Sequence, residues 1–150
     1  MHSSHLLRKG RVSKTNHYYA LTLVCHLRRN HLNNLFINRQ IIHEMRKLEI
    51  EKLITSNTFV LMPNHLHWLI QLSNSLSLSE VVRKFKGRTA TLFRKHYREK
   101  LWQKGFYDHL IRDDEDLVAN ARYIVANPLR AGLVKNITDY AYWDSVYLKI

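Results

Sequence analysis

The spacing of apolar and polar positions along the chain predicts alternating strands and helices. Runs rich in β-branched and aromatic residues predict strands, and apolar residues three or four positions apart predict helices. The predicted elements are, in chain order, a strand at residues 17–27, a helix at 37–53, strands at 55–63 and 65–72, a helix at 75–101, a strand at 105–111 and a helix at 113–128. This order predicts one α+β domain over residues 1–150, with an antiparallel sheet of about four strands and helices packed on one side.

Individual residues set the expected ends of these elements. Asn38 is expected to cap the first helix, and the serines of "SLSLS" are expected to cap the second. Gly87 lies inside the second helix, where glycine weakens continuity. Pro128 should end the third helix near Asn127, because proline pushes the preceding residue out of the α region. The aromatic tail "DYAYWDSVYLKI" is expected to pack onto the body of the domain.

The composition fits a globular intracellular protein. The chain has 150 residues, 45% of them hydrophobic, with only 4 glycines and 2 prolines, which argues against a disordered chain. The single Cys25 excludes an internal disulfide and suits a reducing compartment. The N-terminal stretch lacks the apolar core of a signal peptide, and no window approaches a membrane span. We therefore expect a cytoplasmic protein that does not contact the membrane.

The charge changes this picture more than any other bulk property. Lys and Arg number 24 against 12 Asp and Glu, which gives a formal net charge of +12 and a pI of about 10.0. Such a surface attracts polyanions, and nucleic acid is the first candidate and acidic lipid the second. The alternative is a generally basic protein with no nucleic-acid function.

Two histidines stand one residue apart in the stretch "LMPNHLHWLI". Side chains alternate along a strand, so His65 and His67 share one face, while Leu66, Trp68 and Ile70 share the other. Neighbouring imidazoles are a possible start of a metal site. Because the chain has 10 histidines, roughly 0.7 such pairs are expected by chance, so the motif alone is weak. The alternative is a pair of half-buried histidines bonded to carbonyls.

The helix that ends before Pro128 carries a second suggestive spacing. Tyr123 and Asn127 are four residues apart and project from the same helical face. A phenol is a possible nucleophile, and a carboxamide oxygen is a hard ligand. If this helix packs beside the histidine strand, His65, His67 and Asn127 could hold a divalent cation, with Tyr123 pointing at whatever binds there. Taken separately, the residues have simpler interpretations: Tyr123 could be a core residue, and Asn127 could be a helix terminator.

Taken together, these segments resemble one family. "VLMPNHLHWLI" at 60–70 resembles the histidine-hydrophobic-histidine strand of the HUH single-strand endonucleases, in the form found in single-tyrosine transposases. "ARYIVANPLRAGLV" at 121–134 is similar to the tyrosine helix of that family, and "WQKGFYDHLIRDDEDL" at 102–117 to the segment leading into it. "FKGRTA" at 85–90 and "RKGRV" at 8–12 are also similar. The branch that this chain resembles most is the REP-associated tyrosine transposases.

The resemblance implies a ferredoxin-like or RRM-like HUH fold and a specific chemistry. It makes His65, His67 and Asn127 the ligands of Mg²⁺ or Mn²⁺ and Tyr123 the nucleophile. The implied reaction is cleavage and rejoining of single-stranded DNA at hairpin-forming palindromes, through a 5′-phosphotyrosine intermediate. The implied location is the DNA of the bacterial nucleoid. The family includes both monomers and dimers that share the tyrosine helix, so monomer and homodimer both stay open.

The sequence departs from the family pattern at two places. Trp68 stands where an aliphatic residue is expected, and Val125-Ala126 occupies a place where a histidine is common. Both lie outside the implied ligand set, so they affect placement within a subgroup and not the chemistry.

Basic residues suggest where DNA could bind. Any single basic residue could equally belong to a solvated helix face. The number of basic residues, however, predicts salt-sensitive contacts to the DNA backbone. The candidates are Arg83, Lys84, Lys86, Arg88, Arg94 and Lys95 in the second helix, and Arg8 and Arg11 in an N-terminal arm that could read bases beside a hairpin.

Three other functions remain open. A mobile insertion-sequence transposase would use the same chemistry. A catalytically inactive DNA-binding relative would keep the fold, although all four implied site residues are present. A metal-dependent hydrolase of small phosphoesters would not need so basic a surface.

Overall fold

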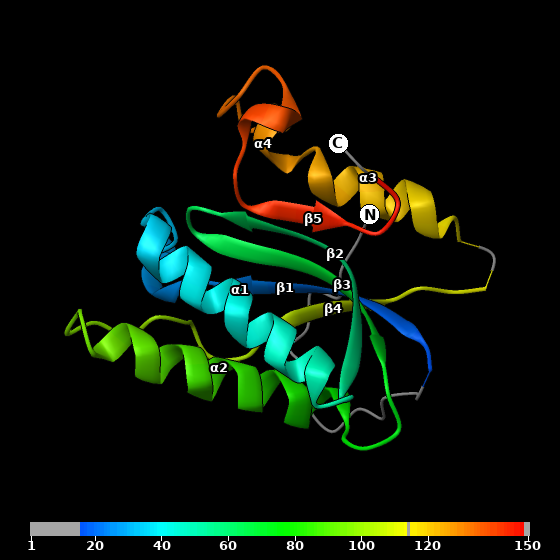
Figure 1. Ribbon diagram of the computed structural model, residues 1–150, viewed down its shortest axis with the longest axis horizontal. Coiled ribbons are helices and arrows are strands. Elements are labelled where there is room, and N and C mark those ends of the chain that lie inside the picture. Colours follow the sequence, from blue (N-terminus) through cyan, green and yellow to red (C-terminus); the bar gives the residue numbers. More distant parts are fainter. Residues whose placement is uncertain (1–15, 114, 149–150) are drawn as a thin grey trace.

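The computed structural model describes residues 16–113 and 115–148, which form a five-stranded sheet flanked by helices (Figure 1). The elements are β1 (Tyr18–Val24), η1 (His26–Arg28), α1 (Leu35–Ile50), β2 (Ile54–Met62), β3 (His65–Leu72), α2 (Leu78–Arg94), β4 (Tyr107–Leu110), α3 (Leu117–Val125), α4 (Asn127–Arg130), η2 (Ile137–Asp139) and β5 (Trp143–Ser145). None of the helices in the described ranges combines the length and the apolar character needed to cross a bilayer.

The sheet has the order β4-β1-β3-β2-β5, and all neighbouring strands are antiparallel. β2 and β3 form a tight hairpin in which Met62 pairs with His65, so the predicted antiparallel pairing of these strands is confirmed. The sheet has one strand more than the sequence predicted. The extra strand is β5, through which the aromatic tail packs on the edge of β2.

The helices cover both faces of the sheet, so the prediction that they lie on one side is wrong. α1 and α2 bury one face, which includes Leu66, Trp68 and Ile70 of β3. α3 covers the opposite face, where Ile124 packs with Leu69. Figure 1 shows α1 and α2 on one side of the strands and α3 on the other. The physical reason is that the strands are apolar on both sides, so each side needs a cover.

The cap of the first helix also differs from the prediction. α1 begins after Asn34, whose Oδ1 accepts a hydrogen bond from the Ile37 amide at 3.1 Å. Asn38 is buried one turn inside the helix, and its Nδ2 donates to the Leu32 carbonyl at 2.8 Å. The sequence offers several asparagines here, and only the entry angle of the chain decides which one caps.

The predicted serine cap of the second helix is confirmed, but the predicted length of this helix is wrong. Ser77 and Glu80 form a capping box at the start of α2. The helix runs through Gly87 without a break and ends at Arg94, well short of residue 101. The chain then turns back, and Gln103 donates its amide to the Val24 carbonyl at 2.9 Å. Residues 101–103, which the sequence placed at and just beyond the end of this helix, instead bond beside the end of β1.

Candidate active site

The histidine pair lies on the face of the sheet that α3 covers. His65 and His67 have the same strand parity as Leu69, which packs with Ile124 of α3. Their ring centroids are 4.6 Å apart and the rings are nearly perpendicular, at 86°. Both side chains are half-buried. The strand therefore presents two adjacent imidazoles on one face, as the alternation predicts.

Each imidazole is oriented by a hydrogen bond at its Nδ1 atom. The Nδ1 of His65 lies 2.6 Å from the Oδ1 of Asn64, and the Nδ1 of His67 lies 3.1 Å from the Oγ1 of Thr22 on β1. Metal-binding histidines are commonly fixed in this way, because a bond at one ring nitrogen directs the lone pair of the other toward the ion. The Nε2 atoms are thus the nitrogens available to a ligand, and the donor set fits a divalent cation.

The protonation of the pair also fits a metal ligand. Burial lowers the pKa of His65 to about 4, helped by the nearby charge of Arg28. Burial lowers the pKa of His67 to about 3, helped by His65 and by Arg130. Both rings are therefore neutral at pH 7, and protons do not compete with a cation for their lone pairs.

Tyr123 is an exposed residue of α3, which excludes the reading of it as a core residue. Its side chain is 43% exposed, whereas Ala121 and Ile124 of the same helix are buried. The guanidinium of Arg130 lies 3.8 Å from the centre of the Tyr123 ring, and its Nη2 donates to the Tyr123 carbonyl at 2.7 Å. Arg130 thus contacts both the ring and the backbone carbonyl of Tyr123.

Arg130 is the residue that sequence reasoning missed. Its charge contributes to the lowered pKa of His67, so one guanidinium lies near both Tyr123 and His67. No local spacing indicated this contact, because Tyr123 and Arg130 lie on two separate helices, α3 and α4, and the junction between them decides how close they come.

Asn127 lies at the junction of α3 and α4, directly before the buried Pro128. Its Nδ2 donates to the Ile124 carbonyl at 3.0 Å, so the amide nitrogen does serve as a helix terminator. The Oδ1 atom is the part of this side chain that a cation could use. Among the described residues, no hydrogen bond joins Asn127 or Tyr123 to either imidazole. The structure therefore brings the two histidines together and places Arg130 in contact with Tyr123, with the charge of Arg130 near enough to His67 to help lower its pKa.

A metal ion at the histidine pair would need a third ligand of another type. Within residues 16–113 and 115–148, no group of three or more His, Cys, Asp or Glu side chains is arranged to hold a metal. Two imidazoles and one neutral amide oxygen is the set that the sequence predicted.

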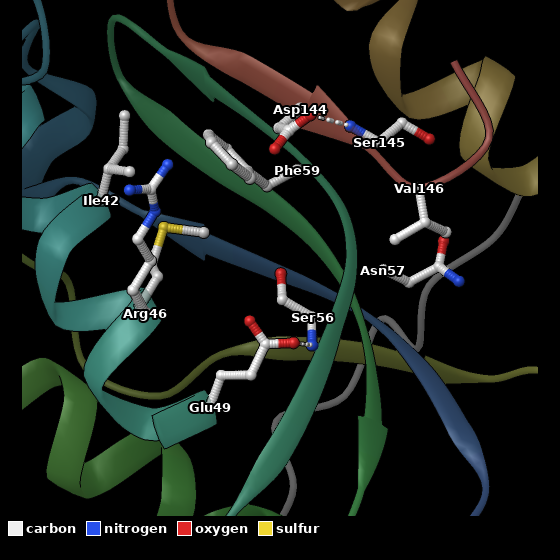
Figure 2. A pocket seen from close by; sticks show the side chains of 10 residues that line it. Ile42, Arg46, Glu49, Ser56, Asn57, Phe59, Asp144, Ser145 and Val146 are labelled. Carbon is white, nitrogen blue, oxygen red and sulfur yellow. Dashed lines mark hydrogen bonds between the residues drawn. The ribbon is translucent and has the colours of Figure 1, made fainter. Parts of the chain in front are cut away.

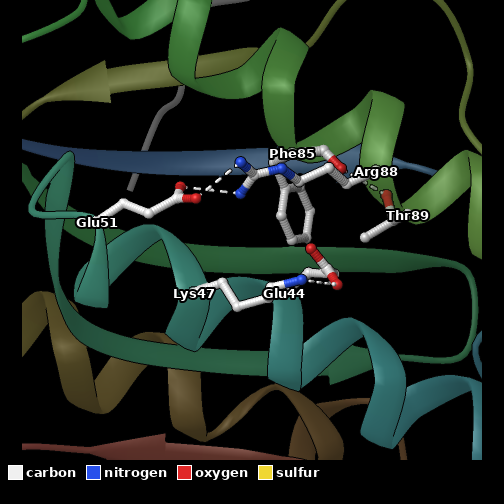
Figure 3. Close-up of polar contacts among 6 residues, drawn as sticks. All are labelled: Glu44, Lys47, Glu51, Phe85, Arg88 and Thr89. Atoms are coloured by element: carbon white, nitrogen blue, oxygen red, sulfur yellow. Dashed lines mark hydrogen bonds and ion pairs between the residues drawn. The ribbon is translucent and has the colours of Figure 1, made fainter.

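Two of the six candidate DNA-binding residues in α2 and at its C-cap are engaged within the protein. Lys86 donates to the carbonyls of Gln103 at 2.8 Å and Gly105 at 2.7 Å, and burial lowers its pKa to about 8. Arg88 forms a bidentate pair with Glu51, at 2.9 and 2.8 Å (Figure 3). The exposed candidates are Arg83, Lys84, Arg94 and Lys95. Arg8 and Arg11 lie outside the described residues.

A small hollow of about 200 Å³ lies between α1 and the strands β2 and β5 (Figure 2). Its acidic side chains are already bonded to backbone amides. Glu49 accepts from Ser56 at 3.0 Å, and Asp144 accepts from Ser145 at 2.8 Å. Ser56 pairs with Ile70, at the far end of β3 from His65. The hollow is therefore separate from the histidine pair.

Comparison with known proteins gives a family. The family model described as "Transposase IS200 like" matches residues 13–127. A Haemophilus influenzae protein assigned as a REP-associated tyrosine transposase is 33% identical over 94 residues, which cover 55% of this chain and 53% of that protein. The REP-associated tyrosine transposase of Escherichia coli K12 is 25% identical over 105 residues, which cover 67% of this chain and 59% of that protein. The chain thus spans little more than half the length of these curated relatives.

A solved structure shares the fold. The structure of a REP-associated tyrosine transposase bound to a REP hairpin superposes with a TM-score of 0.76 at 21% identity, covering 92% of this chain and 82% of that one. The span matched by the family model contains the histidine pair and Tyr123 and ends at Asn127. The chain belongs to the IS200-like transposase family.

Proposed function

We propose that this protein is a metal-dependent single-strand DNA endonuclease and strand transferase that acts at hairpin-forming repeats in the bacterial cytoplasm. The observation that carries the proposal is a pair of neutral imidazoles with oriented Nε2 atoms, on the sheet face covered by the helix that bears the exposed Tyr123. The relatives support the substrate, since one of them is a transposase bound to a REP hairpin. The formal charge of +12 supports a polyanionic partner.

In this proposal, His65, His67 and the Oδ1 of Asn127 hold Mg²⁺ or Mn²⁺. When bound, the ion polarises the scissile phosphate and neutralises charge on its oxygens. Asn64 and Thr22 keep the two imidazoles oriented, through the Nδ1 contacts described above. Arg130 contacts the Tyr123 ring, and its positive charge would lie beside the phosphate that Tyr123 attacks.

The chemical step is an in-line displacement at phosphorus. The Tyr123 oxygen forms a bond to phosphorus as its proton is lost, and the bond from phosphorus to the 3′-oxygen breaks. The leaving oxygen takes up a proton and becomes a free 3′-hydroxyl, while the 5′-phosphate stays on the tyrosine. Because the phosphotyrosine keeps the energy of the phosphodiester, attack by a 3′-hydroxyl rejoins DNA without a nucleotide cofactor.

The test uses end-labelled single strands that carry palindromes, incubated with Mg²⁺ or Mn²⁺ and separated on a denaturing gel. We expect a slowly migrating protein–DNA adduct that is lost in Tyr123→Phe and after chelation. Tyr97→Phe is the matched control, because Tyr97 is 39% exposed and lies in the loop after α2, outside α3. An adduct that survives in Tyr123→Phe would contradict the assigned nucleophile. Binding of hairpins without cleavage or adduct would instead favour the catalytically inactive DNA-binding relative.

The mobile insertion-sequence transposase remains the alternative within the same chemistry. It predicts that the gene lies between subterminal palindromes that the protein cleaves at both ends. The same gel assay with strands from both flanks separates the two functions.

A further inference from the structure

A groove of about 820 Å³ runs along α2, between this helix and the segment at residues 100–106. Both of its walls are fixed. Lys86 of the helix donates to the Gln103 and Gly105 carbonyls and so holds the segment against α2. His26 donates its amide to the Leu101 carbonyl at 2.9 Å, which ties the segment to the end of β1. A volume of this size is in the usual range for ligand sites.

The lining of the groove combines an apolar floor with a basic rim. Val82, Leu101, Trp102 and Phe106 form the apolar part and are almost fully buried beneath it. The cations that line the groove and are exposed to solvent are Arg83, Arg94, Lys100 and Lys104. None of the described residues that line the groove is acidic. An occupant that offers negative charge at the edge and apolar surface inside would complement this lining.

The groove also reaches the end of the sheet that carries the histidine pair. Gln103 bonds to Val24, and Val24 is the residue of β1 that pairs with His65. A chain lying in the groove can thus pass around the end of the sheet toward the candidate active site.

We propose that this groove binds unpaired nucleotides of the DNA substrate, with phosphates at the basic rim and bases over the apolar floor. The inference rests on the proposed function and adds to it the place where the single-stranded part of the DNA lies. Single strands suit the groove because their bases are free to leave the stack, and such grooves combine cationic tracks with apolar platforms. A duplex keeps its bases paired, so it can reach the rim with its phosphates but leaves the floor uncovered.

The groove also divides the cations of α2 into two sets. Arg83 and Arg94 line it, whereas Lys84 on the helix and Lys95 at its C-cap are exposed but do not line it. The proposal therefore predicts unequal contributions from side chains that the sequence cannot tell apart.

Gly87 offers a way to block the groove without changing charge. It lines the groove, and a Cβ built on it meets nothing within 4 Å. A leucine at this helical position can be accommodated and projects apolar bulk into the space that a base would occupy.

The experiment measures the affinity of the whole 150-residue chain by fluorescence anisotropy, with chelator present so that no cleavage occurs. The probes are a hairpin with a single-stranded tail and a blunt duplex of equal length. We expect Arg83→Gln with Arg94→Gln, and Lys100→Gln with Lys104→Gln, each to weaken binding of the tailed hairpin about tenfold and to reduce the salt slope by about 1.4. Gly87→Leu should weaken the tailed probe by a similar factor and leave the duplex unchanged.

The comparison variants remove the same charge elsewhere. Arg39→Gln with Lys135→Gln, both exposed and outside the groove, should change the affinity less than twofold. Lys84→Gln with Lys95→Gln should cost clearly less than the groove pairs. Equal losses from all pairs, an unchanged affinity in Gly87→Leu, or equal losses for tailed and duplex probes would overturn the proposal. Competition by poly-glutamate as strong as by unlabelled single strands would also overturn it, in favour of an acidic peptide.

The experiments distinguish a wrong groove assignment from a wrong proposed function. If the wild-type protein forms the tyrosine adduct but the groove variants bind normally, only the groove assignment falls. If the groove variants lose binding but no adduct ever forms, the groove stands and the catalytic proposal falls.

Discussion

The sheet face under α1 and α2 and the face under α3 are built from the same strands but packed to different depths. On the first, Trp68 and Phe85 are each 1% exposed and lie within a large cluster of buried apolar residues. On the second, α3 contributes Ala121 and Ile124 to a much smaller cluster among the described residues. The same helix leaves Tyr123 largely accessible.

The two faces therefore have different roles: one stabilises the fold, and the other carries the candidate chemistry. The deeply packed face supplies most of the buried apolar area, which drives folding. The thinly covered face keeps polar groups such as His65 and His67 half-buried, where their pKa values shift but a ligand can still reach them. Substitutions on the deeply packed face should therefore lower the free energy of unfolding, whereas substitutions on the thinly covered face should change its pH dependence or the binding of a ligand.

The largest expected effect is on the deeply packed face. Phe85→Ala should lower the free energy of unfolding by about 3–5 kcal/mol, because it removes an aromatic ring from a filled core. Tyr123→Phe, on the other face, should change the unfolding free energy by less than about 0.5 kcal/mol, because the residue is exposed. Urea denaturation of both variants measures this. Similar losses in the two would remove the contrast between the faces.

A fall in pH should lower the free energy of unfolding mainly through groups on the thinly covered face. The pKa values of His65 and His67 are lowered to about 4 and about 3, so their contribution to stability is complete above the unfolded pKa of about 6.5 and is lost as the pH falls. By pH 5 the loss should reach at most roughly 2 kcal/mol for each histidine. Urea denaturation from pH 8 to pH 5, in chelator, measures it. The double variant His65→Gln, His67→Gln should show a flatter profile, and an unchanged profile would contradict the explanation.

A smaller effect should follow from loosening one imidazole. Thr22→Val removes the hydroxyl 3.1 Å from the Nδ1 of His67 and should weaken binding of Mn²⁺ by about tenfold or more. Thr22→Ser, which keeps the hydroxyl, is the matched control. Titration of the protein with Mn²⁺, followed by electron paramagnetic resonance, gives the affinity directly. Equal affinities for wild type and Thr22→Val would show that Thr22 does not position the ring.

The smallest effect is expected in α2. Gly87→Ala should raise the unfolding free energy by about 0.5–1 kcal/mol, because alanine favours the helix and its Cβ has open space. Thermal unfolding detects the change. A decrease would mean that the groove beside Gly87 closes in solution.

Local patterns were sufficient to predict the histidine strand and the second helix cap. β3 covers residues 65–72 as predicted, because its alternation and the preceding Pro63 are readable within a few positions. Ser77 and Glu80 form a cap from residues three apart. The shared face of His65 and His67 follows from the same alternation. Each of these features depends only on backbone geometry over a short stretch.

The tertiary structure decided which of the candidate groups are free to act. The sequence contains the charges of Lys86 and Arg88, but their partners at residues 103, 105 and 51 are identified only when α2 packs on its neighbours. It contains Arg130, but not its place beside the ring of Tyr123. The second cover of the sheet and the fifth strand also join segments far apart in the chain. The sequence by itself determined the local elements and the candidate chemistry, whereas pairing between distant residues depends on the packing of the whole domain.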